Sequence, residues 1–293
     1  MARPTPPGER CAGFTGRTIM NSMAAYEPHP REFVRQVERL YAGLIRAANP
    51  GLDAEPSLGG KLLYAGSLDD KARALLVAAN IAGAASLTVS ADAAAGKQAI
   101  RDGVVDFLVT SLDEALRILK NEIRKRSTVA VCVALEPHAR EADFARHLLQ
   151  RGVLPDLLPP SSAPAPEFAF FLSRGARPVV AIHPDENQVL LDWSVADAPA
   201  QWLPKLDALA LDCLCSDPSP AVVAPGRRWL RLAPRYLGRR SLGARLLRCD
   251  ESTAARFRNQ VQEQVDRGEI PVAVEIQSFP PAVSIRAQSS FTP

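Results

Sequence analysis

The sequence predicts an α/β protein built on a doubly wound parallel sheet with helices on both faces. Two observations lead to this prediction. Segments of strand length alternate strictly with helical segments over residues 61–159, and such alternation is typical of parallel sheets. The predicted strands are almost continuously apolar, as expected for strands that are covered on both faces.

The first element is a helix in PREFVRQVERLYAGLIRAANP, where Phe33, Val37, Leu40 and Leu44 fall at helical spacing and Pro50 ends the run. Residues 1–30 are rich in Pro, Gly and Arg, which predicts a disordered tail. Met20 and Met23 are alternative start residues to Met1.

The alternation itself follows. Two of the helices open with capping signatures, Ser67 with Asp70 and Ser111 with Glu114. Strands are predicted at KLLYAG (61–66), ASLTVSAD (85–92), VVDFLVT (104–110), STVAVCVAL (127–135) and LPDLLP (154–159). Helices are predicted between them, at 67–83, 93–103, 111–126 and 140–152.

The last third is less regular. PPSSAPAPEF breaks the pattern as a loop, with a candidate sub-boundary at 159–166 inside one domain over 31–277. The remaining predictions are strands at RPVVAIH (177–183), LDALALDCLC (206–215), AVVAP (221–225) and IPVAVEIQ (270–277), a helix at 251–268 capped by Asp250 or Ser252, and an irregular tail at 278–293.

Composition excludes several classes of protein. No apolar run reaches the roughly 18 residues of a membrane helix, and the first 20 residues contain no signal-peptide core. The five cysteines are odd in number and irregularly spaced, which favours a reduced, cytoplasmic setting. The net charge of +3 does not point to a polyanion partner for the whole chain.

The segment from GGKLLYAG to ALRILK resembles the urocanase family, the urocanate hydratases. Those proteins carry a strand, a loop of the type AGLGGMGGAQ, a helix ending in AG, a second strand ending in acids, and SLDEAL. PREFVRQVERLYAG, HLLQRGVLPDLL and, more loosely, RLAPRYLGRRSLGARLLRCDES also match family segments. The resemblance covers roughly Pro30 to Gln277. The family's leading segment is missing from it, and whether a separate chain supplies that segment stays open. The resemblance implies a Rossmann-like fold, a homodimer, and a tightly held NAD⁺ that acts as an electrophile on the urocanate imidazole, after which water adds.

The phosphate loop departs from the family. A dinucleotide site uses glycines and a helix N-terminus to hold the pyrophosphate. Only Gly66 is kept, and Ser67, Leu68, Asp69 and Asp70 follow it. Gly66 and Ser67 are the remaining candidate contacts, but two carboxylates in the first turn satisfy the helix dipole and repel phosphate.

Three other family positions also differ. The acid at the end of the second strand falls on Ser90, with Asp92 after it as a candidate ribose contact or helix cap. The family's Asp/Gln/His loop reads LPPSSAPAP, and its catalytic cysteine falls on Leu237, which cannot act as a thiol.

Two further groups of residues are candidates for chemistry. Glu136 and His138 follow a strand at the edge where α/β sheets bind ligands, with a solvated loop as the alternative. Cys213 and Cys215 alternate on a predicted strand, but no histidine or CxxC lies near them, so we expect buried thiols and no metal site.

Residues 227–248 contain eight arginines and no acid, with Trp229 and Tyr236 among them. Arginine suits phosphate or carboxylate, so Arg235, Arg239 and Arg240 are candidate contacts for an anionic ligand. The near-neutral chain argues against nucleic acid. Solvated charge or internal ion pairing is the leading expectation.

Three functions stay open at this stage. The first is a urocanase-like protein that has lost hydratase chemistry and binds a small molecule or a partner. The second is an active enzyme that still holds NAD or another nucleotide with an altered site. The third is an interaction protein that uses the arginine-rich segment.

Overall fold

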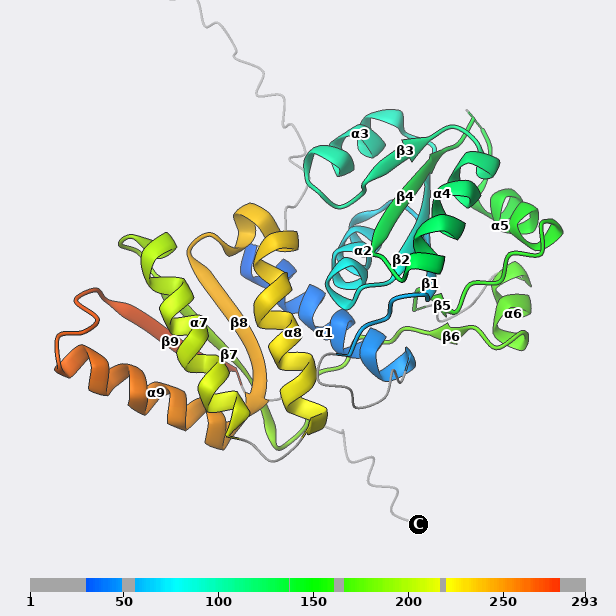
Figure 1. Cartoon of the computed structure of the whole chain (residues 1–293). Helices are drawn as coiled ribbons and strands as arrows, with labels where there is room; N and C mark the ends of the chain where they lie inside the picture. The colour runs from blue at the N-terminus through cyan, green and yellow to red at the C-terminus, as the bar shows by residue number, and fades with distance from the viewer. Residues whose placement is uncertain (1–29, 49–55, 137, 161–165, 217–219, 280–293) are drawn as a thin grey trace, which may run out of the picture.

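The computed structural model describes residues 30–48, 56–136, 138–160, 166–216 and 220–279. They form two sheets with helices around and between them (Figure 1). The tail predicted at residues 1–30 lies outside the described residues except for Pro30, which begins the first helix. None of the described helices is long and apolar enough to cross a membrane.

The first sheet confirms the predicted fold class. All its strands run parallel, in the order β3-β4-β2-β1-β5-β6. The strands are β1 (Leu62–Ser67), β2 (Ala85–Ser90), β3 (Phe107–Val109), β4 (Val129–Ala134), β5 (Leu157–Leu158) and β6 (Arg177–Pro178). The helices are α1 (Pro30–Ala48), α2 (Asp70–Ala82), α3 (Ala93–Arg101), α4 (Leu112–Lys125), α5 (Glu141–Gln150) and α6 (Pro166–Ser173).

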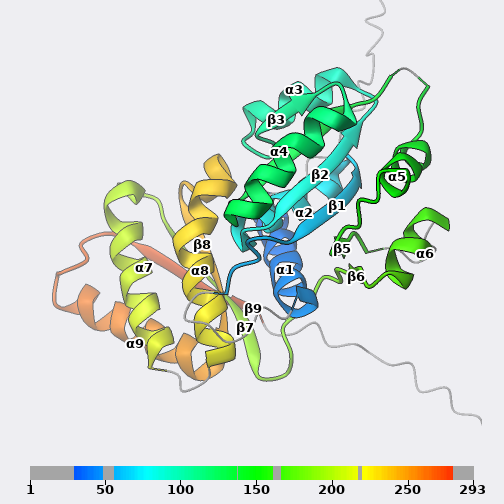
Figure 2. The same ribbon diagram turned by 45° about the vertical axis from the view of Figure 1, so that its right-hand side comes forward.

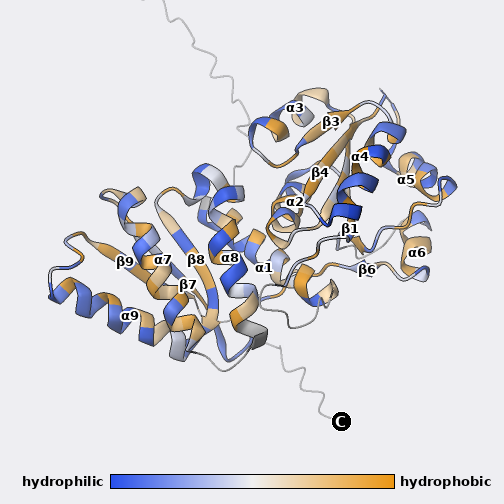
Figure 3. Cartoon of the chain, in the orientation of Figure 1, coloured by the Kyte–Doolittle hydropathy of each residue, from blue (hydrophilic) through white to orange (hydrophobic). Residues whose placement is uncertain are grey.

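The helices cover both faces of this sheet because its side chains alternate between two cores. In β1, Leu63 and Ala65 face the core formed with α1 and α2, while Leu62 and Tyr64 face the core formed with α4, α5 and α6. Figure 2 shows α4 and α2 on opposite sides of β2, and Figure 3 shows hydrophobic colours along β2 and β4.

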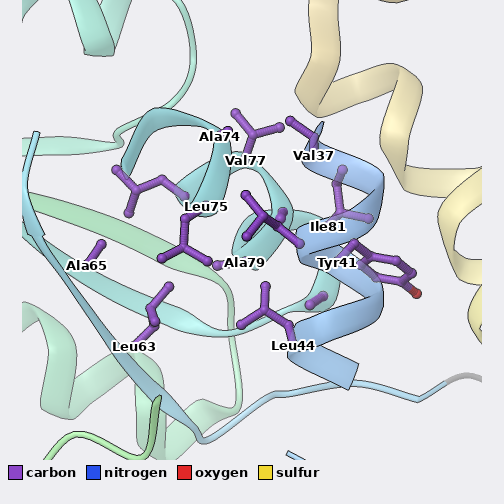
Figure 4. Packing of buried hydrophobic residues seen from close by; sticks show 14 of the residues in the cluster. Val37, Tyr41, Leu44, Leu63, Ala65, Ala74, Leu75, Val77, Ala79 and Ile81 are labelled. Carbon is purple, nitrogen blue, oxygen red and sulfur yellow. The ribbon is translucent and has the colours of Figure 1, made fainter. Parts of the chain in front are cut away.

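Helix α2 is buried on nearly all sides, which explains its alanine-rich sequence. Its residues contact the sheet, α1 and α8 (Pro220–Leu237), and small side chains let all three approach closely. Figure 4 shows Val37, Tyr41 and Leu44 of α1 packed beside Val77 and Ile81 of α2. The helix ends at Gly83, whose φ of 92° suits glycine.

The second sheet is antiparallel, with β7 (Gln188–Val195) between β8 (Ala244–Asp250) and β9 (Val274–Phe279). Helices α7 (Pro199–Cys215) and α9 (Glu251–Asp266) pack on one face. Helix α8 lies between the two sheets and contacts both α2 and β8, and α1 lies next to it (Figures 1 and 2).

Several predictions for the last third are wrong. Residues 206–215 belong to helix α7, because Leu206, Ala210, Cys213 and Leu214 are buried with helical rather than alternating spacing. Residues 221–225 lie in helix α8, and only Arg177–Pro178 pairs within the segment 177–183.

The strands β7 and β8 were not predicted. In β7, Val189, Leu191, Trp193 and Val195 belong to the core formed with α7 and α9, while Asp192 between them lines a cavity with residues of α1 and α8. The last strand, β9, runs to Phe279, so Ser278 and Phe279 do not belong to an irregular tail. The rest of that tail lies outside the described residues.

Candidate functional site

A cavity of about 560 Å³ lies where β1 and β5 end at the carboxyl edge of the parallel sheet. Connections leave β1 and its neighbour β5 toward opposite sheet faces at this point, and open α/β sheets bind ligands at such a switch point. The polar side chains that line the cavity are Gln36, Ser67, Asp69, Lys71 and Glu141. The other lining residues are Leu40, Ala65, Gly66, Ala72, Leu75, Ala142, Pro159, Pro160, Phe168 and Ala181.

The loop after β1 holds a carboxylate of the chain itself. Gly66 has a φ of 75°, and a Cβ there would lie 2.6 Å from Oε1 of Glu141. The Ser67 hydroxyl donates to Oε2 of Glu141 at 2.5 Å. Glu141 is the first residue of α5, so the missing side chain at Gly66 gives space to this carboxylate.

Asp69, rather than Ser67, is the N-cap of α2. Its Oδ1 accepts the backbone N–H of Ala72 at 2.7 Å, and Asp70 adds a second carboxylate in the first turn. The predicted pairing of Ser67 with Asp70 is therefore wrong, since Ser67 still belongs to β1 and bonds Glu141. The helix N-terminus is satisfied by an aspartate, as the sequence suggested.

Glu141 also lies near a buried phenol. Tyr64 is fully buried with no hydrogen-bond partner for its hydroxyl among the described residues. Its pKa is raised above the ordinary value, first by burial and then by the charge of Glu141. The Phe168 ring lies 5.6 Å from the Tyr64 ring and lines the cavity. The phenol therefore stays protonated and packs behind Phe168, inside the core formed with α4, α5 and α6.

Ser90 and Asp92 lie at the end of β2 and do not line the cavity. The Ser90 hydroxyl donates to the backbone oxygen of Asp92 at 2.8 Å. Asp92 caps α3 by accepting the N–H of Ala94 at 2.8 Å. The capping alternative therefore accounts for the Asp92 carboxylate, and its service as a ribose contact remains a prediction.

Glu136 and His138 lie after β4, two strands from β1 in the sheet order. Both are exposed, and His138 has a φ of 76°. Neither lines the cavity. The structure does not bring this pair together with Gly66 and Ser67.

The arginine-rich segment separates into paired and unpaired residues. Arg248 binds both carboxylate oxygens of buried Glu38 at 2.7 Å and the carbonyl of Ile182. Arg245 pairs with Asp207, and Arg228 donates to the carbonyl of Ile81 at the end of α2. These contacts join elements distant in the chain, as the internal-pairing expectation anticipated.

The three candidate arginines are exposed. Arg240 lies 4.3 Å from the ring centre of Phe33, and Arg235 lies 5.4 Å from that of Tyr236. No carboxylate among the described residues pairs with Arg235, Arg239 or Arg240.

Asp192 is a buried carboxylate on the middle strand of the second sheet. Burial raises its pKa and the charge of Glu275 adds to this, while Arg31 and Arg35 oppose it. It lines a separate cavity of about 30 Å³ with Arg240 and Arg31, which is room for about one water.

Cys213 and Cys215 lie on helix α7, not on a strand, so they point in different directions. Cys213 is buried and Cys215 is exposed. Among the described residues no cluster of histidine, cysteine and acidic side chains could hold a metal ion.

Sequence reasoning missed Glu141 as a site residue. Its one signal was its place in the first turn of a helix that follows a parallel strand, which brings it to the ligand-binding edge of the sheet. A model of the urocanase Rossmann-like domain matches residues 40–163. The match contains β1 to β5, Gly66, Asp69 and Glu141.

Proposed function

We propose that this protein, whose residues 40–163 match a model of the urocanase Rossmann-like domain, binds a small molecule at the switch-point cavity without catalysing urocanate hydration. The cavity is in the place where the fold family holds its dinucleotide. The protein has then kept the position of the ligand cavity and lost the ability to bind a pyrophosphate there.

The carboxylate of Glu141 above Gly66 is the observation that carries this proposal. A pyrophosphate at this loop would meet that charge and the carboxylate of Asp69. Two like charges about 4 Å apart cost on the order of 4 kcal/mol near a protein surface. Lys71 is the one cationic side chain in the described lining, so the local balance favours exclusion of phosphate.

The distribution of thiols supports the loss of hydratase chemistry. None of the described cysteines lines the cavity. Leu237, which falls at the family's catalytic cysteine in the looser part of the resemblance, is buried at the end of α8. No described side chain that lines the cavity therefore offers the thiol that this chemistry requires.

The test combines native mass spectrometry with an absorbance assay. Protein purified without added cofactor is weighed native and denatured, then again after addition of NAD. Its action on urocanate is followed by loss of the ultraviolet band, with an active urocanase as the positive control. We expect a bare mass that NAD does not change, and no hydration above buffer. An NAD mass on each subunit or a measurable hydration rate would overturn the proposal.

The homodimer and the cytoplasmic location suggested by the sequence are part of this proposal. Native mass spectrometry reads the number of subunits in the same experiment. Partner binding through the exposed Arg235, Arg239 and Arg240 is the less supported version of this proposal, because a cavity is a more specific feature than exposed charge. It predicts association that falls steeply as salt rises.

A further inference from the structure

We infer that the switch-point cavity takes an organic cation, an ammonium group joined to a compact apolar body. This inference rests on the proposed function and names the chemical class of its ligand. Three features carry it: the size of the cavity, its apolar walls, and the carboxylates that have no cationic partner.

The size and the walls suit a small, largely apolar molecule. About 560 Å³ lies within the range of cavities that hold small ligands. Leu40, Leu75, Phe168, Pro159 and Pro160 supply apolar wall from both helix layers and from the loop after β5. Desolvating an apolar body here is favourable, at about 25 cal/mol per Å² buried.

The carboxylates supply the charge selectivity. Oε2 of Glu141 accepts one hydrogen bond from Ser67 and Oδ1 of Asp69 accepts one from Ala72. The other oxygen of each carboxylate accepts none from the described residues, and neither group forms an ion pair with a described cation. Each therefore has an acceptor left for an N–H donor of a ligand.

Two acids that do not line the cavity behave differently. Asp143, on the same helix as Glu141, pairs with Arg140 and Arg146. Asp102 pairs with Arg73, which lies on α2 close to Asp69 in sequence. Asp143 and Asp102 are therefore neutralised by arginine, whereas Glu141 and Asp69, which line the cavity, form no ion pair with a described cation.

Other ligand charges fit less well. A carboxylate or phosphate would face the same repulsion that excludes dinucleotide. Ca²⁺ and Mg²⁺ need six or more oxygen ligands and Zn²⁺ needs three or four protein ligands, whereas the described residues provide no cluster of three acidic, histidine or cysteine side chains. An ammonium group needs only the one or two acceptors that are present.

The experiment compares two probes of nearly the same shape and opposite charge, 2-phenylethylammonium and 3-phenylpropionate, by isothermal titration calorimetry in low salt. We expect saturable binding of the ammonium, with Kd on the order of 1 mM or tighter for so small a probe, and none of the carboxylate. Glu141→Gln keeps the shape and the Ser67 contact while removing the charge. It should weaken binding about tenfold or more.

Two controls keep the result interpretable. Glu114→Gln removes a carboxylate from the first turn of α4, away from the cavity, and should leave binding unchanged. Asp69→Asn keeps an N-cap residue and should weaken binding even if Glu141→Gln folds poorly.

Some outcomes would overturn the inference. These are equal binding of both probes, binding of the ammonium that both Glu141→Gln and Asp69→Asn leave intact, no binding at all, or saturation by Mg²⁺ alone. They leave the proposed function standing as long as NAD does not bind. Binding of NAD would instead remove the proposed function itself.

Discussion

Replacing Gly66 with alanine tests the contact on which the site depends. The new Cβ would lie 2.6 Å from Oε1 of Glu141, which is the mobile end of a flexible side chain, so the carboxylate is expected to move away. The cost then has two parts. A left-handed φ costs an L-residue about 1–2 kcal/mol, and loss of the Ser67–Glu141 hydrogen bond costs about 1 kcal/mol because Ser67 is exposed.

These two parts can be separated because only the second depends on Glu141. Gly66→Ala should lower the free energy of unfolding by about 2.5 kcal/mol in the wild-type chain and by about 1.5 kcal/mol in a Glu141→Ala background. The coupling of about 1 kcal/mol is measured by urea unfolding, followed by circular dichroism, of the four proteins in the cycle. Equal costs in both backgrounds would refute the idea that Gly66 serves to admit the Glu141 carboxylate.

Three other predictions concern the rest of the molecule. Arg248→Met should cost about 3–5 kcal/mol in urea unfolding, because it leaves buried Glu38 without its bidentate partner; a loss under 1 kcal/mol would contradict this. Burial raises the folded-state pKa of Asp192. The contribution of this carboxyl to the free energy of unfolding is therefore fully present below the unfolded pKa and is lost as pH rises through the folded pKa. Asp192→Asn should stabilise the protein more at pH 7 than at pH 4, and an equal change at both pH values would refute the sign. At pH 8 a maleimide should label exposed Cys215 in the native protein and spare Cys249, whose thiol pKa burial raises to about 12, and peptide mapping that finds both labelled alike would disprove it.

Local pattern was enough to predict the parallel half of the fold. The alternation of apolar strands and capped helices predicted β1 to β5, and Ser111 caps its helix by accepting the N–H of Glu114, as the sequence indicated. The second half was harder, because LDALALDCLC is apolar throughout and such runs do not distinguish a strand from a buried helix. Proline at 204, 225 and 234 inside α7 and α8 further weakened the helical signal.

The site divides in the same way. The sequence by itself determined that the loop after β1 carries one glycine and two aspartates, and so that a helix cap replaces the glycine-rich phosphate loop. Only the tertiary structure decided that Glu141 fills the space above Gly66, since that contact spans 74 positions of the chain. It likewise decided that several arginines of 227–248 bind groups on other elements, as Arg248 binds Glu38 across 210 positions. The physical reason is that a cap is a bond within one turn, whereas charge pairing at a sheet edge depends on which strands become neighbours.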